Sequence, residues 1–130
     1  MELTTQLAVF LDNKPGALAR VCEVLGEADI NIIAISTNDT VDHVVIRMVV
    51  SDPRRAAELF KARGAMALES EVLLIAGDNR PGSLARLARR LADEGINIDY
   101  AYCATSPTAR QGVLILHPTQ PRKALKVLNS

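Results

Sequence analysis

The chain has 130 residues, of which 48% are hydrophobic and 3% aromatic, so its core must be built from Leu, Val, Ile and Ala. Fifteen basic and fifteen acidic residues give a formal net charge of zero, which argues against nucleic acid or an anionic membrane as a partner. The two cysteines form no CxxC pair or Cys/His cluster, so the sequence indicates no disulfide framework, no metal site and no cofactor. Because the first residues have no basic flank and no long apolar run, we expect a cytoplasmic protein without a signal peptide or membrane span.

Apolar periodicity predicts alternating strands and helices in the first half of the chain. Short apolar runs bounded by turn residues indicate strands, and apolar residues at helical spacing after Pro15 indicate a helix that opens at this proline. A second helix begins at Pro53 and ends at Gly64. The predicted order is strand, helix, strand, strand, helix, strand, at residues 6–11, 15–27, 30–36, 43–50, 53–63 and 66–68.

The second half repeats this order but stops one strand early. We predict its strands at residues 72–76, 96–103 and 111–117 and its helices at 81–94 and 121–128. The sequence thus predicts two α+β domains of βαββαβ order, residues 1–70 and 71–130, the second without its C-terminal strand. Residues 72–76 would then form an open sheet edge, unless a strand of the first half, another chain or a truncated segment accounts for the gap.

One stretch of sequence occurs in both halves of the chain. Residues 12–32 recur as residues 78–98 at a constant offset of 66 (78 minus 12), and both copies contain Asp-Asn-x-Pro-Gly and, later, Ile-Asn-Ile. A constant period without gaps indicates two copies of one structural unit. Tyr100 and Tyr102 occur in the second copy only, so we expect the two halves to carry different sites.

Both faces of the predicted sheets are apolar. In the second strand, alternation places Ile30, Ile32 and Ala34 on one face and Ile33 and Ile35 on the other. Two helices cover only one face, so we expect the other face to pack against the sister domain or a second subunit, most simply in a homodimer.

The strand followed by Asp-x-x-Pro-Gly-x-Leu, an amphipathic helix and Ile-Asn-Ile resembles the ACT domain, a ligand-sensing module with the ferredoxin-like fold. Two copies cover essentially the whole chain. The resemblance implies a stand-alone, non-catalytic regulatory protein that binds an amino acid at interfaces between domains or subunits. It also implies a metabolic enzyme of amino-acid metabolism as the regulated partner.

The expected ligand site combines both loops with the Asn of each Ile-Asn-Ile. A helix that starts after Pro-Gly has free amides that favour a carboxylate. Serine-sensing relatives carry a His at the positions of Leu11 and Gly77, which argues against serine as the ligand. The candidate residues are Leu11, Asp12, Asn13, Pro15, Gly16, Ala17, Leu18 and Asn31 in the first copy, and Gly77, Asp78, Asn79, Pro81, Gly82, Ser83, Leu84 and Asn97 in the second.

Each motif also has a structural interpretation. Pro-Gly can simply open a helix, Asn13 and Asn79 can cap it, and Asn31 and Asn97 can bond to neighbouring backbone.

At the level of function, the main alternative is a subunit that docks on a larger metabolic enzyme through the edge at residues 72–76 without binding a ligand.

An enzymatic alternative is an acylphosphatase. Such an enzyme needs an Arg in the first loop, where this chain has Lys14 and Arg80, but the rest of that signature is missing. RNA binding requires exposed aromatic residues on the central strands, which the sequence lacks.

Overall fold

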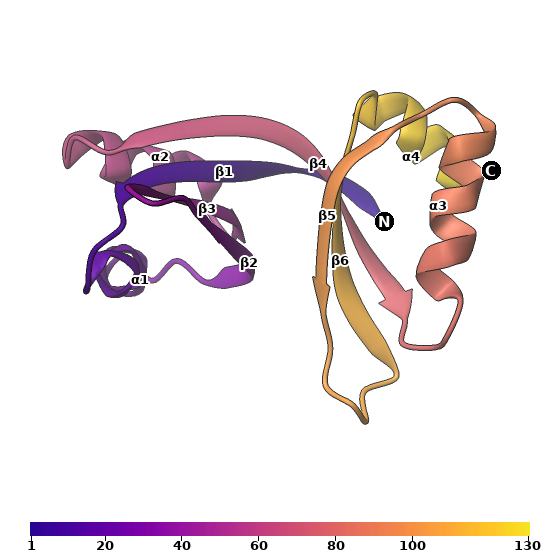
Figure 1. Ribbon diagram of the computed structural model, residues 1–130, viewed down its shortest axis with the longest axis horizontal. Helices are drawn as coiled ribbons and strands as arrows, with labels where there is room; N and C mark the ends of the chain where they lie inside the picture. The colour runs from indigo at the N-terminus through magenta and orange to yellow at the C-terminus, as the bar shows by residue number, and fades with distance from the viewer. The chain divides into compact units, whose positions relative to one another are not determined.

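The computed structural model describes all 130 residues. Its elements follow the predicted order, with four helices and six strands (Figure 1). Their bounds are β1 Glu2–Asp12, α1 Ala17–Glu27, β2 Ile32–Asp39, β3 His43–Val50, α2 Pro53–Ala62, β4 Met66–Asp78, α3 Ser83–Asp93, β5 Ile98–Ala104, β6 Gln111–Pro118 and α4 Pro121–Asn129.

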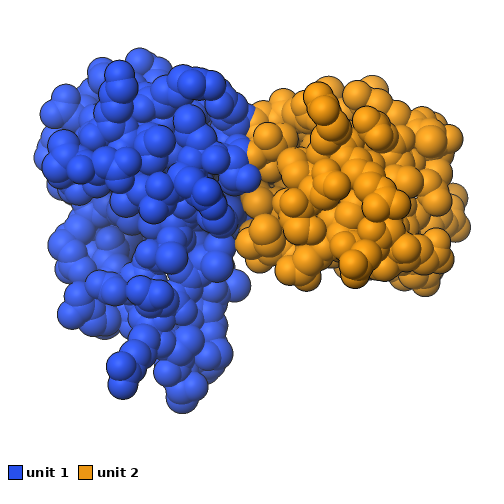
Figure 2. Space-filling model, turned by 180° about the vertical axis from the view of Figure 1, so that it is seen from behind, with its two compact units in different colours: residues 1–4, 71–130 blue, residues 5–70 orange.

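The chain divides into two compact units, which Figure 2 distinguishes by colour. Unit 2 consists of residues 5–70 and contains the first copy of the repeat. Unit 1 consists of residues 71–130 together with residues 1–4, and contains the second copy. The two units therefore follow the halves of the sequence except at the N-terminus.

Unit 2 has the strand order β2-β3-β1-β4, with β1 and β2 both antiparallel to β3. Helices α1 and α2 bury their apolar sides against one face of this sheet. The resulting core contains aliphatic residues and a single aromatic side chain, as the composition requires. Its buried members are Leu7, Val9, Val21, Val24, Leu25, Ile30, Ile46, Met48, Val50, Ala56, Ala57 and Phe60.

Unit 1 has the strand order β1-β4-β6-β5, with α3 and α4 on the same side of its sheet (Figure 1). Its core is smaller and contains no aromatic residue. The pairs Leu73–Leu116 and Ile75–Leu114 direct alternate residues of β4 and β6 toward the helices. Leu91 and Leu128 cover them from α3 and α4.

The fourth strand that the second copy lacks is replaced by the start of the chain. No strand follows α4, as predicted, and the neighbour of β4 in the strand order is β1. Leu3 packs against the core of unit 1, although it belongs in sequence to the first half. Of the three explanations left open for the edge at residues 72–76, a strand of the first half is therefore the one that the fold supports.

The predicted strands at residues 66–68 and 72–76 are one continuous strand, β4. Sequence patterning separated them because Glu69, Ser70 and Glu71 interrupt the apolar run. The polar stretch lies where the chain passes from unit 2 to unit 1, so the backbone stays extended although the side chains change character.

The expected alternation along β2 is wrong because the strand is irregular. Ile32 pairs with Val50 but Ala34 pairs with Val49, so one residue of β2 is extra and the register shifts between Ile32 and Ala34. Adjacent residues of β3 point to opposite faces, and directly paired residues share a face. Ile32 and Ala34 therefore lie on opposite faces of the sheet.

The register of β5 shifts in the same way between Ile98 and Tyr100. Beyond the shift, Tyr100 and Tyr102 pair with alternate residues of β6 and share a face. The ring of Tyr100 stacks on His117 with centroids 4.6 Å apart, a contact that the sequence did not reveal.

Candidate functional site

The Pro-Gly of each repeat forms a tight turn that precedes the helix. In the second copy the amide of Ser83 donates to the carbonyl of Arg80 at 3.2 Å, and Gly82 has φ 87° and ψ −9°. Proline at the second position and a left-handed third residue define a type II β-turn, which favours glycine. The first copy repeats the turn, with Gly16 at φ 89°. The expectation that proline opens the helix is therefore wrong, since α1 and α3 begin after the glycine.

The loop asparagines do not cap the helices, because neither helix has a side-chain cap. The Nδ2 group of Asn13 instead donates to the carbonyl of Thr40 at 3.2 Å, in the turn between β2 and β3. The Nδ2 group of Asn79 donates to the carbonyls of Ser106 and Ala109, at 3.2 and 2.7 Å. Each asparagine thus ties its Pro-Gly loop to the neighbouring hairpin turn.

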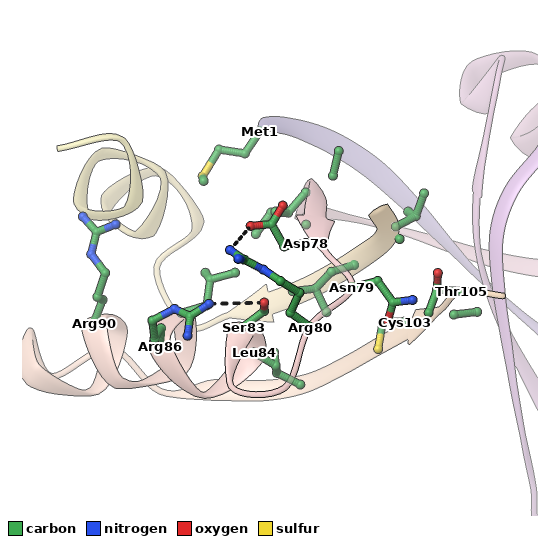
Figure 3. Close-up of a pocket in the computed structure, with 18 residues that line it drawn as sticks. Met1, Asp78, Asn79, Arg80, Ser83, Leu84, Arg86, Arg90, Cys103 and Thr105 are labelled. Atoms are coloured by element: carbon green, nitrogen blue, oxygen red, sulfur yellow. Dashed lines mark hydrogen bonds and ion pairs between the residues drawn. The ribbon is translucent and has the colours of Figure 1, made fainter. Parts of the chain in front are cut away.

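A cavity of about 570 Å³ lies in unit 1 between the start of α3 and the ends of the sheet strands (Figure 3). This volume lies in the range of roughly 300–1,000 Å³ that is typical of small-molecule sites. Its lining is mostly apolar and also contains three arginines and a single acidic residue. The lining residues are Met1, Ile75, Ala76, Gly77, Asp78, Asn79, Arg80, Ser83, Leu84, Arg86, Leu87, Arg90, Cys103, Ala104, Thr105, Gly112, Val113 and Leu114.

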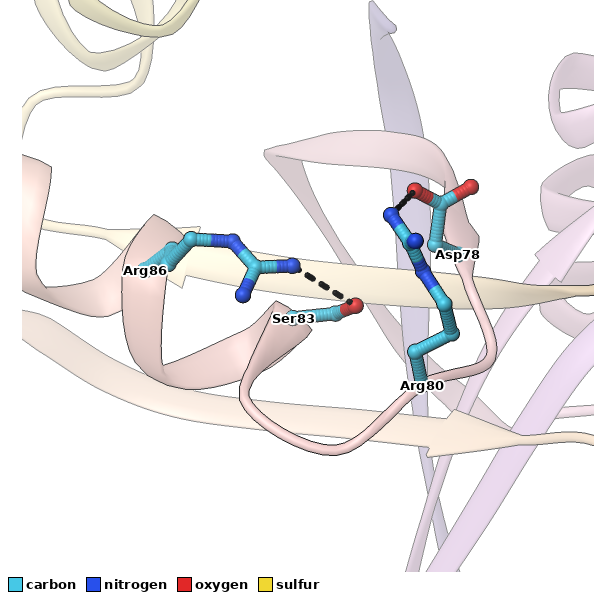
Figure 4. Close-up of polar contacts among 4 residues, drawn as sticks. All are labelled: Asp78, Arg80, Ser83 and Arg86. Carbon is cyan, nitrogen blue, oxygen red and sulfur yellow. Dashed lines mark hydrogen bonds and ion pairs between the residues drawn. The ribbon is translucent and has the colours of Figure 1, made fainter.

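The arginines of the cavity have different partners. Arg80 forms an ion pair of 3.0 Å with Asp78 (Figure 4). Arg90 donates to the last carbonyls of α4, including that of Leu128 at 3.3 Å, where the helix dipole favours a cation. Arg86 donates only to the hydroxyl of Ser83, at 3.3 Å, and has no carboxylate partner (Figure 4).

Free backbone amides add to the positive potential near Arg86. Arg86 donates its own amide to the carbonyl of Gly82, but the amides of Leu84 and Ala85 have no protein acceptor. The first turn of α3 contains no acidic residue that would balance them. An anion at this end of the cavity would meet both a guanidinium and the start of a helix.

The corresponding cavity of unit 2 is much smaller, at about 180 Å³. It lies against the first loop and includes Arg20, the counterpart of Arg86. Phe60 of α2 lines it, and this ring belongs to the buried core of the unit. A volume of this size falls below the usual range for small-molecule sites, so the two units differ in the space that lies beside the loop.

The structure brings together only part of the predicted site. The large cavity is lined by five of the candidates, Gly77, Asp78, Asn79, Ser83 and Leu84, and the small one by Leu11, Asp12 and Ala17. The two central residues of each turn line neither cavity: Pro15, Gly16, Pro81 and Gly82. Asn13 and Leu18 also lie outside the small cavity.

Asn31 and Asn97 lie at the other end of their sheets. The backbone of Asn31 exchanges two 2.9 Å hydrogen bonds with Ser51, whereas Asp12 pairs with the opposite end of β3 at His43. This separation is roughly 25 Å at about 3.4 Å per residue. Asn97 is likewise exposed, and its Nδ2 donates to the carboxylate of Asp99 at 3.1 Å. Within one unit these asparagines therefore do not meet the loops.

Sequence reasoning missed the residues that give the cavity its charge and its walls. The repeat could have identified Arg86, because its counterpart in the first copy, Arg20, is also an arginine. The repeat gave no such indication for Arg90, Cys103 and Thr105. The first copy has a different kind of residue at the position of Arg90, and Cys103 and Thr105 lie outside the repeated stretch.

No group of three or more His, Cys, Asp or Glu residues is arranged to hold a metal ion. No helix is long and apolar enough to cross a bilayer.

Two ferredoxin-like units in tandem, each with a Pro-Gly turn leading into its first helix, define a paired α+β protein. The family model for the ACT domain pair matches residues 2–129. The chain therefore belongs to the ACT domain family, which confirms the resemblance deduced from the two loops.

Solved structures agree with this assignment. A protein from Bacteroides thetaiotaomicron is 31% identical, with a TM-score of 0.90 over 98% of this chain and 87% of that one. The regulatory subunits of aspartate kinase from Thermus thermophilus and Thermus flavus share the fold. They have TM-scores of 0.71 and 0.63 at 20% and 19% identity, over 99% and 98% of this chain and 96% and 94% of theirs. A comparison with curated proteins finds no match.

Proposed function

We propose that the chain is a non-catalytic regulatory protein that binds an amino acid in the cavity of unit 1, beside the second Asp-Asn-x-Pro-Gly loop. The observation that carries the proposal is the 570 Å³ cavity, which lies against five of the loop residues predicted from the sequence. Arg86, the lining cation without a carboxylate or helix-end partner, offers a partner for the ligand's carboxylate.

The proposed regulated partner is an enzyme of amino-acid metabolism. Two of the structural relatives are named as regulatory subunits of aspartate kinase, and they share the fold of this chain. The rival model, in which the chain docks through an open edge at residues 72–76 and binds nothing, loses its main support because β1 is the neighbour of β4.

Titration calorimetry with each of the twenty amino acids tests the proposal. At least one should bind, with a stoichiometry of one per chain, because the cavity of unit 1 has the volume of a ligand site and the one beside the first loop does not. Absence of heat with all twenty would contradict the function.

A cavity-filling variant locates the site. Ser83→Trp places a large ring in the cavity of unit 1 and should abolish the binding. Ala17→Trp makes the matching change in the first copy (83 minus 66), beside the small cavity of unit 2, and should leave binding intact. The reverse result would put the ligand in unit 2. Thermal melting of both variants checks that they fold.

A further inference from the structure

The floor of the unit 1 cavity is part of the apolar core. Ile75 of β4 and Leu114 of β6 are buried in that core, and Leu87 of α3 packs against it. All three also line the cavity. A ligand group that reaches this floor meets hydrocarbon only, so burial of an apolar group there is favourable by about 25 cal/mol per Å². A charged group would lose its hydration without gaining a partner.

The charged residues that line the cavity leave one cation free for a carboxylate. Arg80 is neutralised by Asp78 and Arg90 is held by the carbonyls at the end of α4, so Arg86 is the one lining cation without an anionic or helix-end partner. Its guanidinium also lies close to Gly82, since a Cβ at that position would come within 3.3 Å of Nη1.

The placement of Arg86 is electrostatically unfavourable in the absence of an anion. A cation at the start of a helix opposes the helix dipole, and α3 has no acidic residue in its first turn. A single carboxylate beside Arg86 and the free amides of Leu84 and Ala85 would reverse this repulsion.

From the apolar floor and the single unpaired cation, we infer that the cavity selects amino acids with an apolar side chain. Arg86 and the α3 amides bind the α-carboxylate, and the side chain lies on the floor formed by Ile75, Leu87 and Leu114. A second carboxylate, as in aspartate or glutamate, would find no further unpaired cation. A side-chain ammonium, as in lysine, would find no unpaired acid, because Asp78 is paired with Arg80. The inference rests on the amino-acid site proposed above.

Calorimetry with L-leucine, L-valine and L-methionine against L-aspartate, L-glutamate and L-lysine tests the selectivity. At least one apolar amino acid should bind tenfold or more tightly than any of the three charged ones. Tighter binding of a charged amino acid would overturn the inference while leaving the proposed function intact. Failure of every amino acid to bind would overturn the function itself.

A second experiment tests the role of Arg86. Arg86→Gln should weaken the binding of the tightest apolar ligand about 10- to 100-fold, as expected for loss of a hydrogen bond to a charged group. The amide derivative of that ligand, which lacks the carboxylate charge, should bind as weakly to the wild type. Arg89→Gln is the matched control, because Arg89 lies on the same helix, pairs with Asp93 and does not line the cavity. Equal affinity of the wild type and Arg86→Gln in correctly folded protein would refute the assignment.

Discussion

The loop asparagines precede the helices but do not cap them. Asn13 and Asn79 stand three residues before the helix-entry glycines, too early to reach the free amides of the helix. Their side chains donate instead to carbonyls of the β2–β3 and β5–β6 turns. The asparagine therefore fixes the Pro-Gly loop against the hairpin, and in unit 1 Asn79 also lines the cavity.

The two asparagines should differ in their contribution to stability. Asn79→Ala removes two side-chain hydrogen bonds and should lower the free energy of unfolding by about 1–3 kcal/mol, whereas Asn13→Ala removes one and should cost about 0.5–1.5 kcal/mol. Urea denaturation followed by circular dichroism measures both. Asn31→Ala is the control, since the hydrogen bonds of Asn31 are made by its backbone. An equal loss in the two loop variants would contradict this account.

At the scale of elements, the strands depend on partners that lie far away in the sequence. The periodicity of residues 6–11 predicted a strand, but β1 begins at Glu2 because its first residues have a neighbour in β4. The same non-local pairing makes β4 continuous across Glu69, Ser70 and Glu71, where the apolar pattern fails. Helix positions were predicted to within a few residues because helical contacts are local.

Leu3 tests whether the start of β1 stabilises unit 1. Leu3→Ala should destabilise this unit by about 1–2 kcal/mol, less than the roughly 2–5 kcal/mol of a fully buried leucine, because Leu3 is half-buried. Hydrogen exchange measured by mass spectrometry should then become about 5- to 30-fold faster in core peptides from residues 71–130. Peptides from residues 5–70 should not change.

Leu68→Ala provides the control, because Leu68 lies on β4 but is exposed and belongs to unit 2. This variant should leave exchange in residues 71–130 as it is. An unchanged exchange pattern with Leu3→Ala would show that the N-terminal residues contribute nothing to the second copy.

At the scale of the whole molecule, unit 2 retains apolar surface that its helices do not cover. Ile33 and Ile35 of β2 are 41% and 40% exposed, and β2 is at the edge of its sheet, where unpaired backbone groups can accept another strand. We propose that a second copy of the chain covers this edge, in the homodimer expected from the sequence.

Sedimentation equilibrium should accordingly give a mass of twice the chain's 14.0 kDa. A charged pair of substitutions, Ile33→Lys with Ile35→Lys, should produce the monomer, because lysine on an edge strand opposes pairing. Val41→Lys, at a position 92% exposed in the β2–β3 turn, should leave the dimer unchanged. A wild-type monomer at micromolar concentration would refute the dimer.

Local information in the sequence determined the repeat, the order of elements, the family and the loop beside which the cavity lies. Turn chemistry and periodicity act over a few residues, so they can be recognised without knowing the partners of each segment. Even there, the Pro-Gly was interpreted as a helix start rather than a type II turn, because both place proline and glycine next to a helix.

Only the tertiary structure decided which copy contains a cavity of ligand size and which arginine there lacks a partner. The two loops are nearly identical in sequence, yet Phe60 lines the smaller space in unit 2, whereas Arg90 lines the larger one in unit 1 and turns to the end of α4. These differences arise from residues 30 to 40 positions away along the chain. Packing and charge compensation depend on distance in space, which a repeated local pattern does not specify.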